Sequence, residues 1–269
     1  QAEDGLNEMT LLYMSGHLEE ALLIGHASLE RLERTGFAEG IADAKSRVGS
    51  LLSIAGRHAA ARTMLEQAYF SAGAMKDDEV AAAAARHLAG IGAGPAPHGI
   101  EWVRGWASHA SMLHARLGMS SSFEEAEVHE SLAAALADVD SPGSQPEEIE
   151  LIGKARDIRA SLVGEDHPAV LVADINLAVY AAQEDPHVPL DRIRSAGKRL
   201  RLALGPGHPT MVSMHLMTGG ILAERGQLTE ALADMDRAIT LSVDVNGPDH
   251  PQTMRAREIR EEVMALRQP

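Results

Sequence analysis

The sequence predicts an all-α fold, a right-handed superhelical solenoid of helix–turn–helix repeats with about six helical pairs and a C-terminal capping helix. Three observations support this prediction. The composition favours helices, a short glycine–histidine–proline motif recurs at an almost constant interval, and small residues return with the same interval.

The composition is that of a helical protein with a real core. Apolar residues make up 45% of the chain, but aromatic residues make up only 3%. The apolar content therefore comes from Ala, Leu, Ile, Val and Met. Ala and Leu are the strongest helix formers, and the aromatic residues that favour strands are scarce.

A Gly-x-x-His-Pro motif occurs three times in the second half of the chain. It is found at Gly164–Pro168, Gly205–Pro209 and Gly247–Pro251, and its histidines are 41 and then 42 residues apart. Gly adopts the left-handed conformation that closes a helix, and Pro is favoured at the first position of the next helix. The motif therefore predicts the end of one helix and the start of another.

Each motif lies between two stretches with helical composition. We expect helices before the three glycines at 147–163, 189–204 and 229–246, and helices after the prolines at 169–183, 210–225 and 252–268. The last of these carries charged residues suited to an end cap, Arg255, Arg257, Glu261 and Glu262. The repeating unit is a helical hairpin of about 42 residues, longer than the usual 34-residue tetratricopeptide unit.

Small residues recur where paired helices would touch. One set, Gly49, Leu52, Gly56, Ala61 and Ala68, has the same spacing as a second set, Gly219, Leu222, Gly226, Ala231 and Ala238. An alanine also recurs at intervals of 41 to 45 residues, at Ala68, Ala110, Ala155, Ala196 and Ala238. Such residues let helix axes approach to about 8 Å, so their return reflects packing.

These residues resemble the tetratricopeptide repeat family in its long, kinesin-light-chain-like form. The stretch from Ile100 to Ala110, with Gly118 and the Gly-x-x-His-Pro units after it, is similar to the C-terminal repeat regions of myxobacterial serine/threonine protein kinases. This second resemblance implies a regulatory or docking module attached to a catalytic domain. The chain opens with Gln1, so we expect it to be a piece of a longer protein.

We expect one solenoid over residues 1–269, with soft breaks at 90–99 and 140–146, where Gly and Pro accumulate. The net charge of −15 disfavours nucleic acid and anionic membranes as partners. No apolar run approaches the roughly 20 residues of a membrane span, and no signal peptide is visible. We therefore expect a cytoplasmic protein.

The sequence predicts neither an enzyme nor a cofactor or metal site. Nucleophile-elbow, phosphate-loop, kinase and zinc-protease motifs do not occur. His167, His208 and His250 occupy equivalent positions of neighbouring repeats, about 10 Å or more apart, too far to share a metal ion. Adjacent acidic pairs, namely Glu124/Glu125, Glu147/Glu148 and Glu261/Glu262, are interpreted as solvated helix faces.

The main candidate site is the concave groove that first helices of each pair form in this family. The family register assigns to it Asn176, Val179, Gln183, Ser213, Leu216, Glu224, Glu127, Glu130, Asp43, Ser46 and Ser50, with Arg255 and Glu258 on the final helix. The resemblance implies that Asn176 hydrogen-bonds the backbone of an extended peptide. We expect a mildly acidic groove that prefers a neutral or basic segment.

Three other features have a structural interpretation beside a functional one. The stripe of Met211, Met214 and Met217 indicates core packing or an adaptable binding surface. Trp102 and Trp106 indicate anchors of an irregular third repeat or a stacking surface. The basic cluster of Arg192, Arg194, Lys198, Arg199 and Arg201 indicates a solvated face or a dock for an acidic partner.

Three functions remain open at this point. The first is a scaffold that binds a protein or peptide partner in its concave groove. The second is an intramolecular regulatory or dimerisation module of an attached kinase domain. The third is a sensor that holds a small ligand near Trp102 and Trp106. The partner and the oligomeric state are not predicted by the sequence.

Overall fold

A computed structural model describes residues 2–15, 17–92, 99–137, 145–184, 190–208, 210–248 and 250–266. Within these ranges, the side chains of residues 2, 145, 182–184, 246, 251 and 252 are not described. The chain divides into two compact units, unit 1 (Gln1–Ala155) and unit 2 (Arg156–Pro269). The boundary falls inside a helix and not in either of the two stretches where soft breaks are predicted.

The described residues form thirteen helices and no strand. Unit 1 contains α1 (Ala2–Met14), α2 (Leu18–Thr35), α3 (Ala38–Ile54), α4 (His58–Met75), α5 (Asp78–Gly92), α6 (Ile100–Arg116) and α7 (Phe123–Ala137). Helix α8 (Gln145–Val163) contains the boundary. Unit 2 continues with α9 (Pro168–Glu184), α10 (Asp191–Leu204), α11 (Thr210–Glu224), α12 (Leu228–Asn246) and α13 (Pro251–Ala265).

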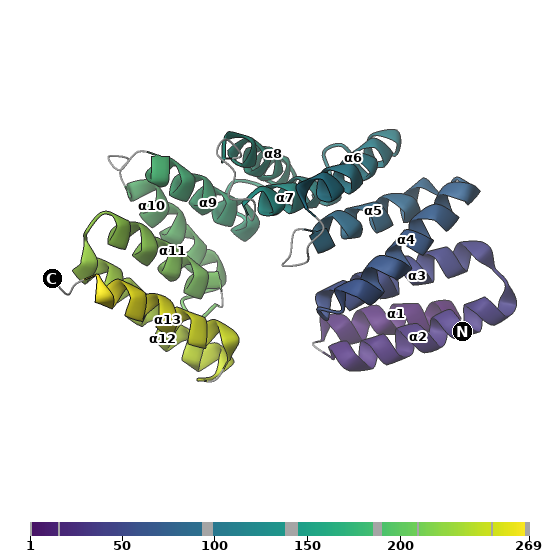
Figure 1. The fold of residues 1–269 in the computed structure, drawn as a ribbon, viewed down its shortest axis with the longest axis horizontal. Helices are drawn as coiled ribbons and strands as arrows, with labels where there is room; N and C mark the ends of the chain where they lie inside the picture. The colour runs from purple at the N-terminus through teal and green to yellow at the C-terminus, as the bar shows by residue number, and fades with distance from the viewer. Residues whose placement is uncertain are drawn as a thin grey trace. The chain divides into compact units, whose positions relative to one another are not determined.

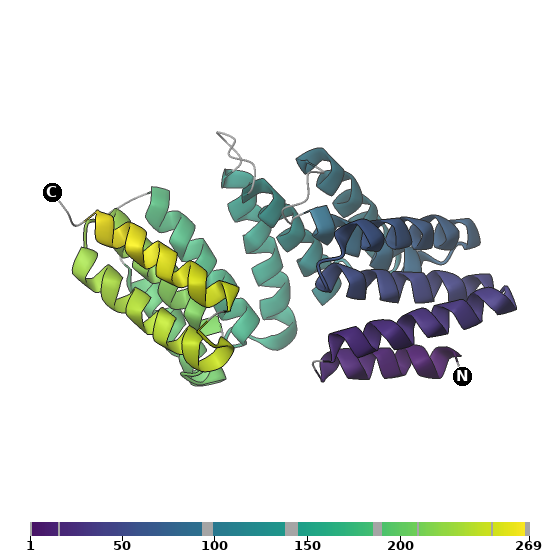
Figure 2. The same ribbon diagram turned by 60° about the horizontal axis from the view of Figure 1, so that its bottom comes forward.

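Within each unit, consecutive helices pack side by side as antiparallel pairs (Figure 1). Helix α3 packs on α4, α5 on α6, α9 on α10 and α11 on α12, and α13 lies against α12 (Figure 2). First helices also contact the first helices of the adjacent pairs, as α3 contacts α5 and α5 contacts α7. The helices predicted around the Gly-x-x-His-Pro motifs are confirmed, with ends that differ by at most a few residues.

The glycines of the motif end their helices as predicted, but Gly205 and Gly247 have ψ values of 158° and 162° and not those of the predicted left-handed conformation. Gly164, Gly205 and Gly247 follow directly after α8, α10 and α12, and each has a positive φ, of 86°, 85° and 94° respectively. Gly reaches this region without the steric cost that a Cβ atom imposes. Pro168 and Pro251 begin α9 and α13, whereas α11 begins at Thr210 and Pro209 lies outside the described residues.

Small residues allow close contact between paired helices. A Cβ atom on Gly49 of α3 would lie 2.7 Å from Cγ of Leu65 on α4, so only glycine fits without movement. Gly219 of α11 faces Met235 of α12 in the same way. The recurring alanines Ala68, Ala110, Ala155, Ala196 and Ala238 are all buried, which confirms their predicted packing role.

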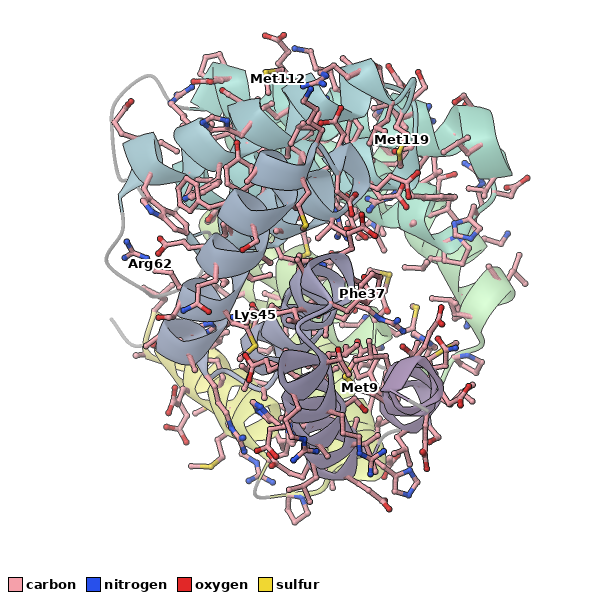
Figure 3. All side chains as sticks on the ribbon, turned by 90° about the vertical axis from the view of Figure 1, so that its right-hand side faces the viewer. Met9, Phe37, Lys45, Arg62, Met112 and Met119 are labelled. Carbon is pink, nitrogen blue, oxygen red and sulfur yellow. The ribbon has the colours of Figure 1, made fainter. Side chains whose placement is uncertain are left out.

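The core consists of aliphatic residues. Leu65 and Leu88 are fully buried in unit 1, as are Leu171 and Leu200 in unit 2. Burying one such side chain contributes about 2 kcal/mol. In Figure 3, Met9 lies among the helices of unit 1, whereas Phe37 lies at the surface and is 54% exposed.

One detail of the sequence prediction is corrected. Residues 90–92 were expected in a loop, but Gly90, Ile91 and Gly92 form the last turn of α5. Ile91 is buried there, and its packing outweighs the low helix propensity of its glycine neighbours. Residues 93–98 and 138–144 lie outside the described residues. The predicted cap helix α13 exposes Arg255, Arg257, Glu261 and Glu262 and buries Ala256.

Candidate functional site

A groove runs across the first helices of unit 1. One cavity, of about 400 Å³, is lined by side chains of α1, α3 and α5. A second cavity, of about 480 Å³, is lined by α3, α5 and α7. The two cavities share Ser50, Ile54, Arg86 and His87 and therefore form one continuous depression, which we call the unit 1 groove.

Five of the predicted groove residues line this depression. Asp43, Ser46 and Ser50 come from α3, and Glu127 and Glu130 come from α7. They lie on one face of each helix because their spacing of three or four residues corresponds to about one turn. Their placement agrees with the predicted register, and their role in binding stays a prediction.

The centre of the groove is a hydrogen-bonded network around His87 of α5. Nδ1 of His87 lies 3.3 Å from Oγ of Ser50, and Nε2 lies 3.2 Å from Nη2 of Arg86. Burial, together with the nearby charge of Arg86, lowers the pKa of His87 from 6.5 to about 3. A guanidinium group only donates, so Nε2 of the neutral ring accepts and Nδ1–H donates to Ser50.

Arg86 links this network to the next repeat. Its guanidinium group forms an ion pair with Glu127 of α7. The ion pair and the contact with His87 hold the side chain across the floor of the groove. The groove is therefore preformed at this point by side chains from α3, α5 and α7.

Arg47 has the corresponding role at the other end of the groove. Its guanidinium group on α3 donates to the carbonyl oxygen of Leu6 and to Oγ1 of Thr10 on α1, both at 2.9 Å. It also lies 3.7 Å from Asp43. Burial raises the pKa of Asp43, and the charge of Arg47 offsets only part of that rise.

The unit 1 groove is acidic on balance. Its lining residues include four carboxylates, on Asp43, Glu79, Glu127 and Glu130, against the two guanidinium groups of Arg47 and Arg86. Because His87 is neutral at ordinary pH, it does not change this balance.

The remaining predicted groove residues belong to unit 2. Asn176 and Val179 are half-buried on α9, and Val179 packs against the unit 2 core. On α11, Leu216 is half-buried, and Ser213 and Glu224 are exposed. The side chain of Gln183 lies outside the described residues. Arg255 and Glu258 lie 3.2 Å apart as an exposed ion pair on α13.

Sequence reasoning missed Arg86 and His87. Ser46 and Glu127 were assigned to the groove because they occupy equivalent positions of their repeats. Arg86 occupies the same position of the repeat between them, 40 residues after Ser46 and 41 before Glu127. Extending that register to the helix between them identifies Arg86. His87 is found only when the burial of its ring is known, because its neighbour Ser50 belongs to the preceding repeat.

Two histidines of the repeated motif, His167 and His208, have a structural role. Nδ1 of His167 accepts a hydrogen bond from the backbone N–H of Ala169, at 3.3 Å, and Nδ1 of His208 accepts one from Thr210, at 3.2 Å. Each imidazole therefore caps one of the unpaired N–H groups at the start of a helix. Among the described residues, no group of three or more His, Cys, Asp or Glu side chains has the arrangement of a metal site.

Two acidic residues interpreted as solvated are buried. Glu125 is 6% exposed because His114 and Ser111 of α6 satisfy its carboxylate, and Glu148 is 5% exposed. Burial raises the pKa of Glu148. Adjacent residues on a helix point about 100° apart, so one member of an acidic pair can face the core while the other faces solvent.

The tryptophans belong to an aromatic cluster on the second helices of unit 1. Trp106 packs edge-on against Tyr69 of α4, with ring centroids 4.9 Å apart, and Trp102 lies 6.1 Å from Trp106. Arg62, labelled in Figure 3, lies over the Trp102 ring. These contacts confirm the anchoring interpretation.

The methionine stripe is also confirmed as packing, since Met211 is buried and Met214 and Met217 contact the unit 2 core.

Comparisons with known proteins agree with this architecture. The tetratricopeptide repeat family matches residues 219–252, which include the end of α11, all of α12 and the first residues of α13. No curated protein sequence matches the chain. Solved structures do, including the crystal structure of BtubC (BKLC) from P. vanneervenii. The TM-score is 0.63 at 19% identity, and the match covers 87% of this chain and 94% of that one.

A second similar structure is the assembly chaperone of RpL4 (Acl4). Its TM-score is 0.57 at 17% identity, and the match covers 99% of this chain and 98% of that one. At such low identity both likenesses show the fold alone. Together they confirm the class of fold, an all-α solenoid of tetratricopeptide-type helical repeats. Among the described residues, no helix is long and apolar enough to cross a membrane.

Proposed function

We propose that the chain is a protein-interaction scaffold and that the unit 1 groove binds a peptide segment of a partner protein. The observation that supports this most directly is the continuity of the groove over four first helices, α1, α3, α5 and α7. Repeat solenoids offer extended surfaces of this kind to partner chains. The tetratricopeptide match supports a protein partner in general.

The chemistry of the groove favours a neutral or basic segment. Asp43 and Glu127 are paired with arginines inside the groove, so they contribute little further charge. Glu79 is exposed at the groove wall and forms no ion pair with the described residues. A Lys or Arg of the ligand would meet this carboxylate, and the Ser46 and Ser50 hydroxyls would meet polar backbone groups.

The test is a peptide selection followed by charge reversal. Peptides selected from a random display library on the immobilised chain are expected to include neutral or basic sequences, and these are the ligands assigned to the unit 1 groove. Binding of the selected peptides is measured by fluorescence anisotropy. Glu79→Lys is expected to weaken binding about tenfold, since it turns attraction at the groove wall into repulsion.

Glu20→Lys is the matched control. Both residues are exposed acids in the first turn of a helix, but Glu20 lies on the second helix α2 and does not line the groove. It is expected to leave binding unchanged. Equal effects of the two substitutions on these peptides would contradict groove binding.

A second binding surface, on unit 2 by itself, is a further part of the proposal. It rests on the family register, which assigns Asn176, Val179, Gln183, Ser213, Leu216 and Glu224 to first helices α9 and α11. Asn176→Ala tests it, because loss of a hydrogen bond to the ligand backbone weakens all selected peptides to a similar degree. A partner domain on the same polypeptide, such as a kinase domain, would bind by the same chemistry.

A further inference from the structure

Unit 2 contains a separate cavity on the side of its second helices. Its volume is about 600 Å³, and it is lined by α10, α11, α12 and Pro206 of the α10–α11 turn. Ile193, Met211 and Met214 supply its apolar lining, and Met211 is 1% exposed. Volumes of roughly 300–1,000 Å³ are usual for ligand sites.

The rim of this cavity is strongly basic. Arg194, Lys198 and Arg201 come from α10, where steps of four and three residues place them on one face. Arg237 of α12 faces them. The opposite face of α10 buries Ala196 and Leu200, so the core fixes which side of the helix the cations occupy.

The cavity has an incomplete set of counter-charges. Asp234 of α12 lies 2.7 Å from Arg237 and 3.2 Å from Nδ1 of His215 on α11, so it is already shared by two donors. Arg194 pairs with Glu230 at 3.3 Å. Within the described part of the chain, Lys198 and Arg201 form no ion pair, although the whole chain carries a net charge of −15.

The other members of the basic cluster differ from these three. Arg199 points to the α8–α9 turn, where it lies 2.7 Å from Asp166 and donates to the carbonyl oxygen of Glu165. Arg192 is exposed and does not line the cavity. The basic cluster is therefore divided between a structural contact, a solvated residue and a cavity rim.

We propose that this cavity is a docking site for an acidic segment of a partner protein, in which a carboxylate bridges Lys198 and Arg201 and an adjacent apolar side chain contacts Met214. Clusters of basic residues are a recurring means of recognising acidic motifs. Unpaired cations beside an apolar floor match an acidic residue with a hydrophobic neighbour. The proposal is independent of the unit 1 groove, whose charge preference is the opposite.

A segment fits this cavity better than a compact free anion does. The cations stand at an exposed rim, where a single ion pair contributes only about 0–1 kcal/mol. Useful affinity therefore requires several contacts made together, with part of the ligand on the methionine floor. The adaptable thioether side chain of Met214, which is half-buried, suits such a ligand.

The first experiment compares two short labelled peptides by fluorescence anisotropy. One contains Glu-Leu-Glu between Gly and Ser residues, and the other has Gln in place of both Glu residues. The acidic peptide is expected to bind saturably and the Gln peptide about tenfold more weakly, since charge-assisted hydrogen bonds are the stronger kind. Equal binding of the two peptides would overturn the proposal.

Variants of the chain then locate the site. Lys198→Ala combined with Arg201→Ala is expected to weaken the acidic peptide about tenfold, and Arg192→Ala about twofold at most. Neither Lys198 nor Arg201 supports the fold through an ion pair, so the double variant should fold. Circular dichroism confirms this.

Three further outcomes decide the matter. Met214→Gln should weaken the acidic peptide while leaving the charges intact. Equal weakening by Arg192→Ala would show general electrostatic attraction and overturn the site. Displacement of the peptide by an RNA oligonucleotide of the same charge would show a non-specific polyanion surface and overturn it too. Glu79→Lys changes only the unit 1 groove, so failure at one site is distinguishable from failure at the other.

Discussion

His114 and Glu125 form a buried pair between neighbouring repeats. Nδ1 of His114 on α6 lies 2.7 Å from Oε2 of Glu125 on α7, and the two residues are 1% and 6% exposed. Ser111 donates to the other carboxylate oxygen, also at 2.7 Å. This polar contact lies within an otherwise apolar interface and fixes the register of α7 against α6.

Removing the histidine should destabilise unit 1 strongly. His114→Ala leaves the Glu125 carboxylate buried with an incomplete set of donors, so we expect a loss of about 3–5 kcal/mol in the free energy of unfolding. Urea denaturation measures this loss. In a double-mutant cycle, Glu125→Ala added to His114→Ala should cost much less than Glu125→Ala alone. Additive losses would contradict the coupling.

The same pair should make the stability of unit 1 depend on pH in the acidic range. Burial raises the pKa of Glu125, but hydrogen bonds from His114 and Ser111 outweigh it and leave the pKa below its ordinary value of 4.5. A lowered carboxyl pKa contributes stability above the unfolded pKa that is lost as the pH falls below it. Wild-type protein should therefore lose stability below about pH 4.5, and Glu125→Gln should lose less over that interval.

His87 should make unit 1 sensitive to acid at higher pH. The pKa of His87 is about 3 in the folded chain and 6.5 in the unfolded chain. Between these pH values the imidazole is protonated in the unfolded chain and neutral in the folded chain. The free energy of unfolding should fall as the pH drops below 6.5, by at most about 1.4 kcal/mol per pH unit. His87→Gln, which can keep contacts with Ser50 and Arg86, should fall less steeply. If the free energy of unfolding fell equally with pH in the two proteins, the lowered pKa of His87 would be contradicted.

Helix contact at Gly49 should not tolerate even a methyl group. Gly49→Ala places Cβ within 2.7 Å of Leu65, and we expect a loss of about 1–3 kcal/mol. Gly105→Ala is the control, because Gly105 lies within α6 and no atom would lie within 4 Å of its Cβ. Its higher helix propensity should raise stability by about 0.5–1 kcal/mol. Thermal unfolding distinguishes the opposite signs.

Lys76 is the one non-glycine residue with a positive φ in the described part of the chain. It ends α4 at φ 61°, in the position that Gly36 occupies after α2 at φ 72°. Lys76→Gly should therefore stabilise the protein by about 1 kcal/mol. Gly36→Lys should destabilise it by a similar amount, since a Cβ there meets no atom within 4 Å and only the backbone is strained.

The fold was predictable because its determinants are local and periodic. Gly164, Gly205 and Gly247 mark helix ends by a backbone property that the residue type alone indicates. Alanines such as Ala68 and Ala238 repeat at the interval of the helical pair, so their burial follows from periodicity. The class of fold and the helix positions could be inferred before any coordinates were known.

The candidate sites were predictable only in part. The register placed Asp43, Ser46 and Ser50 in the groove, but the network around His87 depends on side chains from three repeats. No local pattern distinguishes Lys198 and Arg201 from Arg199, although the cavity separates them. The burial of Glu125 depends on His114, which belongs to the preceding helical pair. The resemblance to myxobacterial kinases and the cytoplasmic location stay predictions.

The packing of each helix on its near neighbours has a consequence for how the chain folds. In the described residues, the helices that make extensive contact are at most two positions apart in chain order. Little chain entropy is lost in forming such short-range contacts, so folding should be fast and can begin in any repeat. A substitution that destabilises one hairpin then lowers the stability of the neighbouring hairpins more than that of distant ones. Whole hairpins become the natural units by which such a chain can grow or shrink.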